Sequence, residues 1–96
     1  MNGRSIGAVG ERLVVDALVR SLTPDSYVFA LEAEVWVSDG GPIRCYFDGR
    51  TPDGNTGVVL MAGNRLTLAS LYEIAAFRYV QRTGGAAGAL EVVYRK

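Results

Sequence analysis

The spacing of apolar side chains changes several times along the chain, and each change predicts a different element. In residues 5–22 they recur every three or four positions, which predicts an amphipathic helix that Ser5 caps and Pro24 terminates. Charged residues stand four apart in this segment, as expected on the solvated face of a helix. These residues are Arg12, Asp16 and Arg20. Because Val15 and Val19 widen the apolar stripe, we expect this helix to be well covered or to form part of a contact surface.

Three strands are expected next. Residues 27–37 alternate apolar and other side chains, which predicts a long strand with one apolar face. Residues 38–42 have turn composition, and alternation resumes over residues 43–48 as a second strand. A second turn is expected at residues 51–55, where proline and glycine suit a tight turn. Residues 58–62 are wholly apolar, which predicts a third strand buried on both faces, so the three strands form an antiparallel meander.

The last third of the chain predicts a second helix and a final strand. Thr67 can cap a helix that runs to residue 82, with the two glycines of residues 84–85 ending it. Residues 89–95 alternate again and predict a fourth strand. The expected fold class is therefore α+β in αβββαβ order, with two helices on a mixed, mainly antiparallel four-stranded sheet. At 96 residues the chain forms one domain, residues 1–96.

Composition excludes several kinds of chemistry. The chain has 10 basic and 10 acidic side chains, no histidine, and a single lysine, the C-terminal Lys96. Histidine-dependent nucleophiles, imidazole metal ligands, Schiff-base lysines and the lysine of a phosphate-binding loop are therefore excluded. A formal net charge of zero also gives no support to nucleic acid as a partner, although local clustering of arginines leaves it open.

The same composition gives an expected setting. Cys45 is the only cysteine and alternates with the apolar Ile43 and Phe47, so we expect a buried, inert thiol in a reducing compartment. No apolar run is long enough for a membrane span, and the N-terminal segment does not have the pattern of a signal peptide. We therefore expect a cytoplasmic protein with no membrane partner.

The predicted element order resembles a known nuclease superfamily. The chain resembles the PD-(D/E)XK, or restriction-endonuclease-like, superfamily in its αβββαβ order and in three stretches. These are residues 7–12 in the first helix, Asp48 at the end of the second strand, and residues 72–77 followed by the glycines 84–85. In size and spacing the chain is most similar to Holliday junction resolvases. The resemblance implies a restriction-endonuclease-like core and spans nearly the whole chain.

The resemblance also implies a metal site. Family members hold magnesium with a glutamate of the first helix, an aspartate of the second strand and an acid-x-lysine of the third strand. Glu11 and Asp48 match the first two positions. If the hairpin is centred between Asp53 and Gly54, Asp48 faces Val59 across the two strands. The acid-x-lysine positions then fall in residues 60–63, at Leu60 and Ala62 or at Met61 and Gly63, where neither an acid nor a lysine stands.

Residues of neighbouring elements offer substitutes for the missing acid and lysine of the third strand. Glu73 is a candidate for the third carboxylate, so Glu11, Asp48 and Glu73 would be the catalytic and metal-binding acids. Arg65 is a candidate catalytic residue that would stabilise a developing negative charge without acting as a base, and Arg78 is an alternative to it.

Three functions follow from these alternatives. The leading hypothesis is a nuclease-like domain with an incomplete metal site that acts as a binding or assembly module, as a homodimer or with a protein partner, with Trp36 as a candidate contact. The first alternative is a Mg²⁺-dependent DNA or RNA phosphodiesterase, and no cofactor is expected otherwise. The second is a small structural or partner-binding protein unrelated to nucleases. In each case we expect Glu32 and Glu34 to pair with Arg44 across the strands.

Overall fold

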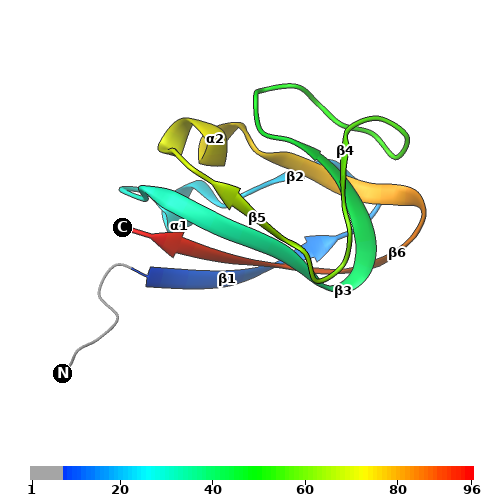
Figure 1. Ribbon diagram of the computed structural model, residues 1–96, viewed down its shortest axis with the longest axis horizontal. Helices are drawn as coiled ribbons and strands as arrows, with labels where there is room; N and C mark the ends of the chain where they lie inside the picture. Colours follow the sequence, from blue (N-terminus) through cyan, green and yellow to red (C-terminus); the bar gives the residue numbers. More distant parts are fainter. Residues whose placement is uncertain (1–7) are drawn as a thin grey trace.

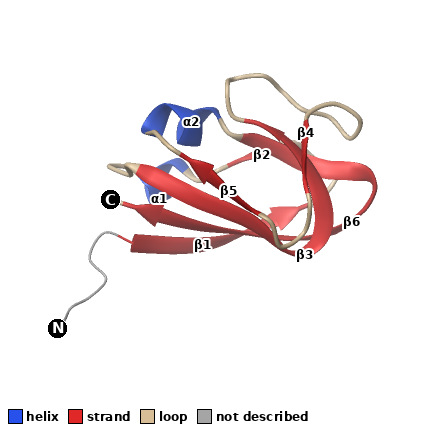
Figure 2. Cartoon of the chain, in the orientation of Figure 1, coloured by secondary structure: helices blue, strands red, loops and turns tan. Residues whose placement is uncertain are grey.

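The computed structural model describes residues 8–96. Within this part the strands and helices follow one another in the order β1 (Ala8–Val15), β2 (Arg20–Ser21), α1 (Pro24–Tyr27), β3 (Glu32–Tyr46), β4 (Val58–Leu60), β5 (Arg65–Leu68), α2 (Leu71–Ala76) and β6 (Arg78–Arg95). The α+β class is confirmed, with a six-stranded sheet and two short helices in place of the four strands that the sequence predicted (Figures 1 and 2).

Two long strands organise the sheet. β3 and β6 pair with each other over most of their length, β1 and β2 lie along the other side of β6, and β4 and β5 lie along the other side of β3 (Figure 1). Every pairing among the described strands is antiparallel, so the expected mainly antiparallel character is confirmed, whereas the expected mixed pairing is not found in residues 8–96.

Both long strands bend sharply at the same level. The pairing of β3 with β6 shifts register three times between Val37 and Ile43, and such irregularities bend and twist a strand. Gly40 has a φ of 70°, and a Cβ added to Gly88 would lie 1.9 Å from the carbonyl oxygen of Asp39, so glycine is required where the two backbones approach. The bend folds the sheet over its own core.

This bend corrects the predicted meander. Residues 38–42, which we expected to form a turn between two strands, lie inside the single strand β3. Residues 84–88, which the predicted helix end and the final strand left as a connection, lie inside β6. Turn-forming residues produce a bend here because the opposite strand continues to pair on both sides of them. The αβββαβ element order is therefore wrong for residues 8–96.

The predicted first helix is wrong in the part that the structure describes, and its proposed cap Ser5 lies outside that part. Residues 8–15 form β1, with Val15 buried, Leu13 half-buried and Arg12 and Val14 exposed. This alternation fits the two-residue period of a strand. The same segment also fits the helical spacing of three to four residues, and its pairing with β6 decides in favour of the strand. Asp16 and Arg20 do form the expected i,i+4 ion pair, at 2.6 Å, in the turn between β1 and β2.

The predicted second helix is also largely wrong. Thr67 lies in β5, and the helix α2 contains only six residues, because Ser70 caps it and the chain returns to the sheet at Arg78. The final alternating segment, residues 89–95, is confirmed as a strand within β6. Neither helix in residues 8–96 is long and apolar enough to cross a membrane.

The hairpin register differs from the predicted one. Val59 pairs with Arg44 rather than with Asp48, and Leu60 pairs with Ile43. The connection between the strands is a long loop, residues 47–57, so the turn at residues 53–56 is its tip and does not set the register. The alignment that placed Asp48 opposite the third strand is therefore wrong, as is the expectation that this strand is buried on both faces, since Val58 is 54% exposed.

The core lies on the concave face of the bent sheet. It is built from alternating residues of β3 and β6 together with side chains of the two helical segments. Tyr27, at the end of α1, packs against Tyr94, with ring centroids 6.3 Å apart, and Phe77 stacks on Tyr79 at 5.8 Å. Both helices lie at the end of the sheet where β3 begins and β6 ends (Figure 2).

Candidate functional site

Glu11 lies on the inner side of β1, where it supports the core. Its carboxylate accepts a short hydrogen bond from the Tyr94 hydroxyl and a second one, at 3.4 Å, from the Ser26 hydroxyl. Burial raises the pKa of Tyr94 well above its usual range, and the hydrogen bond to Glu11 raises it further. Glu11 thus links β1 to the end of β6 and to α1.

Asp48 lies in the exposed loop that follows β3. Its carboxylate forms an ion pair with Arg50, 2.7 Å from Nη2, and the hydrogen bond from the Arg50 side chain lowers its pKa. The Arg50 guanidinium also lies over the Tyr46 ring, 4.0 Å from the ring centre. This arrangement fixes the loop at the end of β3.

Glu73 caps the helix that contains it. Its carboxylate accepts a hydrogen bond of 2.7 Å from the backbone N–H of Ala69, while its own N–H donates to the Ser70 hydroxyl at 3.2 Å. The two contacts satisfy backbone donors at the start of α2 in the manner of a capping box. A helix-capping role therefore accounts for both polar groups of Glu73.

Arg65 belongs to the outer face of the sheet. It pairs with Glu34 at 2.9 Å and lies over the Trp36 ring at 4.0 Å. Arg95 pairs with Glu32 at 3.0 Å. The expected cross-strand ion pairs of the two glutamates are therefore confirmed, but the expected partner is wrong, because Arg44 instead donates to the carbonyl oxygens of residues 54 and 57.

The structure places the predicted site residues on separate elements. Glu11 is on β1, Asp48 in the loop after β3 and Glu73 on α2, and each carboxylate is engaged by a partner of its own. In residues 8–96 no group of three or more histidine, cysteine, aspartate or glutamate side chains is arranged to hold a metal ion. Their assignment to catalysis and to Mg²⁺ stays a prediction from the sequence.

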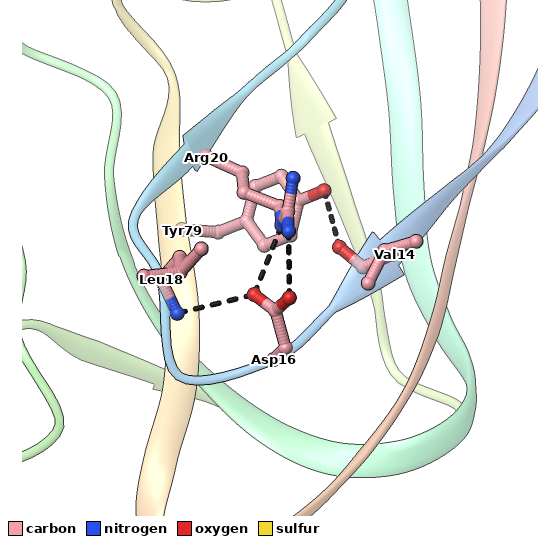
Figure 3. Close-up of polar contacts among 5 residues, drawn as sticks. All are labelled: Val14, Asp16, Leu18, Arg20 and Tyr79. Carbon is pink, nitrogen blue, oxygen red and sulfur yellow. Dashed lines mark hydrogen bonds and ion pairs between the residues drawn. The ribbon is translucent and has the colours of Figure 1, made fainter.

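A cleft of about 490 Å³ separates β1 from β2. Arg20 donates from Nε and Nη2 to the two carboxylate oxygens of Asp16, at 2.9 and 2.6 Å, and the Leu18 N–H donates to the same carboxylate at 3.1 Å (Figure 3). The hydrogen bond from Arg20 lowers the pKa of Asp16. At the base of the cleft the Tyr79 hydroxyl donates to the carbonyl oxygen of Val14 at 2.8 Å (Figure 3).

The chemistry of this cleft favours binding over catalysis. Burial raises the pKa of Tyr79 to about 12, so at neutral pH its hydroxyl is a hydrogen-bond donor rather than a base. Asp16 is held ionised by Arg20, and the cleft lining contains no cysteine. The sequence prediction missed this cleft because it placed both β1 and β2 in one continuous helix, residues 5–22, and assigned Tyr79 to a second helix rather than to β6.

The most unusual surface is an apolar end of the molecule. Five large apolar side chains are exposed there, and we call this set the apolar end. It consists of Val28, Phe29, Leu31, Leu71 and Tyr72. Phe29 is 82% exposed, Leu31 70% and Tyr72 68%.

Chain topology brings these residues together. Phe29 and Leu31 lie between α1 and β3, while Tyr72 lies at the start of α2, directly after β5 (Figure 1). Leu68 of β5 pairs with Ala33 of β3, and α1 contacts α2, so the two segments meet at one end of the sheet. The periodicity of the sequence assigned these side chains to the faces of a strand and a helix, and no local pattern indicated their exposure.

Cys45 and Trp36 have ordinary structural surroundings. Cys45 is completely buried, which confirms its expected burial, and this burial raises the pKa of its thiol to about 11, so the thiol is protonated at neutral pH. Trp36 is half-buried beneath Arg65, so the structure gives its ring an intramolecular partner.

Comparison with known proteins gives no match for this chain: no family model fits it, and no curated protein or solved structure is similar to it.

Proposed function

We propose that this domain is a protein-binding or assembly module that acts through its apolar end. The observation that carries the proposal is Phe29, which is 82% exposed and has a φ of 68°. A bulky residue rarely adopts a positive φ, and the conformation costs about 1–3 kcal/mol. Hydrogen bonds from the Ala30 N–H to the Tyr27 carbonyl oxygen and from the Leu31 N–H to the Arg95 carbonyl oxygen hold the backbone here, at 2.9 and 2.7 Å. The Phe29 ring itself stays exposed in the isolated domain, and insertion into a partner would bury it.

The neighbours of Phe29 support a contact surface rather than an isolated exposed residue. Leu31 and Tyr72 present further apolar area at the same end, and aromatic side chains are frequent anchors of protein interfaces. By contrast, the acids and arginines of the outer sheet face pair with one another, as in Arg12 with Glu91 at 2.8 Å. The apolar end lacks such internal pairing and is the surface best suited to a partner.

Site-specific photo-crosslinking tests this proposal. We would replace Tyr72 with benzoylphenylalanine in the full chain, irradiate cells that express it, and measure discrete adducts by mass. Phe29→Asn should reduce the adduct at least about tenfold, because loss of an interface anchor costs at least about 1.4 kcal/mol. Val58→Asn, which alters an exposed valine on β4, should leave the adduct unchanged.

Two outcomes would overturn the proposal. One is the absence of any discrete adduct from position 72. The other is an adduct that Phe29→Asn and Val58→Asn change equally. The adduct mass also distinguishes a second copy of this chain from a different protein.

The competing hypothesis is the Mg²⁺-dependent phosphodiesterase suggested by the nuclease resemblance. It predicts cleavage of labelled DNA or RNA that requires magnesium and is lost in Asp48→Asn. Our proposal predicts no cleavage above the background of a buffer blank. Asp48 is preferable to Glu11 as the test residue, because a change at Glu11 also removes the hydrogen bond to Tyr94.

A further inference from the structure

Residues 23–29 cross one end of the sheet between two buried anchors, and we call them the strap. Leu22 is 1% exposed and Ala30 is 2% exposed, whereas none of residues 23–29 is buried. The strap contains α1, which has four residues, no buried side chain and no hydrogen bond from the side chain of its N-cap. Because burial of apolar area is what mainly holds a surface segment to a core, the strap is weakly held.

Ser26 and Tyr27 tie the strap to the sheet. The Ser26 hydroxyl donates to the Glu11 carboxylate at 3.4 Å, which is long for a hydrogen bond between a hydroxyl and a carboxylate. The partly buried Tyr27 ring packs against Tyr94. Within residues 8–96 no ion pair adds to these contacts. The strap can therefore detach without breaking any pairing between strands.

Phe29 adds backbone strain to the closed strap. Tyr27 is packed on the core before it, and Ala30 is anchored after it, where the Leu31 N–H donates to the Arg95 carbonyl oxygen at 2.7 Å. The chain must turn between these two fixed points, and Phe29 does so with a φ of 68°. A bulky residue rarely adopts this conformation, and a strap that has detached at Tyr27 is free to leave it. Opening therefore releases strain.

The neighbouring helix α2 is attached in a different way. Ile74 of α2 is completely buried, and the Ser70 side chain caps the helix. Phe77, directly after the helix, is also completely buried. Both helices lie at the same end of the sheet (Figure 2), so their position does not explain the difference. Weak attachment is a property of the strap and not of this end of the molecule.

We propose that the strap opens as one unit while the sheet stays folded, and that its closure completes the apolar end. Two of the five residues of the apolar end, Val28 and Phe29, belong to the strap, while Leu31, Leu71 and Tyr72 lie outside it. Opening moves the first two away from the other three, so the whole surface exists only in the closed state. The use of this surface rests on the function proposed above, but the opening itself does not.

Amide hydrogen exchange of the full chain, followed by NMR, tests the opening. The reporters are the N–H groups of Ser26 and Ala30, which donate at 2.9 Å to the carbonyl oxygens of Thr23 and Tyr27. The reference is Val92, which is 1% exposed in the central strand β6. Both reporters should show the same protection, at least about a hundredfold below that of Val92. Urea below the unfolding transition should speed exchange at Val92 but hardly at the reporters, because opening the strap exposes little surface.

Two variants separate opening of the strap from unfolding of the whole domain. Phe29→Asn should slow exchange at both reporters about two- to fivefold, because asparagine relieves part of the strain of the closed strap. Ile43→Val removes a buried methyl group of β3 away from the strap, so it should speed exchange at Val92 severalfold and leave the reporters unchanged. Val58→Asn, at an exposed position on β4, is the control and should change neither rate.

Three results would overturn the proposal. They are protection at the reporters equal to that at Val92, protection that differs more than about tenfold between Ser26 and Ala30, and exchange that Phe29→Asn does not slow. The measurements use the chain alone, so they are independent of the photo-crosslink from position 72. An adduct without opening of the strap would leave the proposed function standing, and opening without an adduct would overturn the proposed function only.

Discussion

Phe77 and Phe29 each follow a short helix, yet they occupy opposite environments. Phe77 is completely buried and stacks on Tyr79, and its N–H bonds back to Ile74 as the chain leaves α2 for β6. Phe29 is 82% exposed at a positive φ in the connection from α1 to β3. The difference shows that the backbone path, rather than the residue type, decides which aromatic ring stabilises the fold and which is presented to solvent.

Truncation of Phe77 should give the largest effect on stability. Phe77→Ala removes a fully buried ring beside Tyr79, so the free energy of unfolding should fall by about 3–5 kcal/mol. Urea unfolding followed by Trp36 fluorescence measures this change. A loss below about 1 kcal/mol would contradict the comparison, because the buried Phe77 would then contribute little more to stability than an exposed side chain.

Tyr94 extends the comparison to the polar part of the core. Tyr94→Phe removes the hydroxyl that donates to the Glu11 carboxylate, and a hydrogen bond to a charged group contributes about 1.5–3 kcal/mol. Tyr79→Phe is the matched control, because its hydroxyl donates to a neutral carbonyl oxygen and should cost only about 0.5–1.5 kcal/mol. Equal losses in the two variants would contradict a special role for Glu11.

Cys45 should make the stability of the core depend on alkaline pH. The thiol pKa is about 11 in the fold and 9.0 in an unperturbed cysteine, so the unfolded chain ionises first. This contribution is complete below pH 9 and is lost as the pH rises from 9 to 11, with a loss of about 1 kcal/mol near pH 10. Cys45→Val should lose less stability than the unmodified chain over this range in parallel urea titrations; identical pH profiles would exclude the buried thiol as the cause.

Arg65 should give the smallest effect, because it acts on the outer face. Arg65→Ala removes a cation–π contact with Trp36 and a partly exposed ion pair with Glu34, which together contribute about 0.5–1 kcal/mol. The emission of Trp36, the only tryptophan, should shift to longer wavelength as its ring becomes solvated. An unchanged emission maximum would indicate that Arg65 does not cover the ring.

The sequence predicted the local alternation better than the connections. Residues 89–95 and the inward-facing Ala33, Val35 and Val37 follow the expected period of two, because burial on one face of a sheet imposes it. The first helix was wrong because the β1 segment satisfies both periods, and only pairing with β6 distinguishes them. The turn expected at residues 38–42 became a bend because β6 pairs across it.

The candidate surfaces were harder to predict than the core. Exposure of Phe29 depends on the path from α1 into β3, and the cleft beside Tyr79 depends on two segments about 60 residues apart in sequence meeting on β6. No local spacing encodes either arrangement. Glu11 and Glu73 were predicted as metal-binding acids, and their observed hydrogen bonds, with Tyr94 and with the backbone at the start of α2, were not predicted from the sequence.

Phe29→Asn tests the central claim most directly, because asparagine tolerates a positive φ and removes the exposed ring. If Phe29 is presented for a partner, the free energy of unfolding in urea should rise by about 0.5–1 kcal/mol, as part of the backbone strain of about 1–3 kcal/mol is relieved, while the adduct from position 72 is lost. A fall of more than about 1 kcal/mol with the adduct retained would show that Phe29 serves the fold instead.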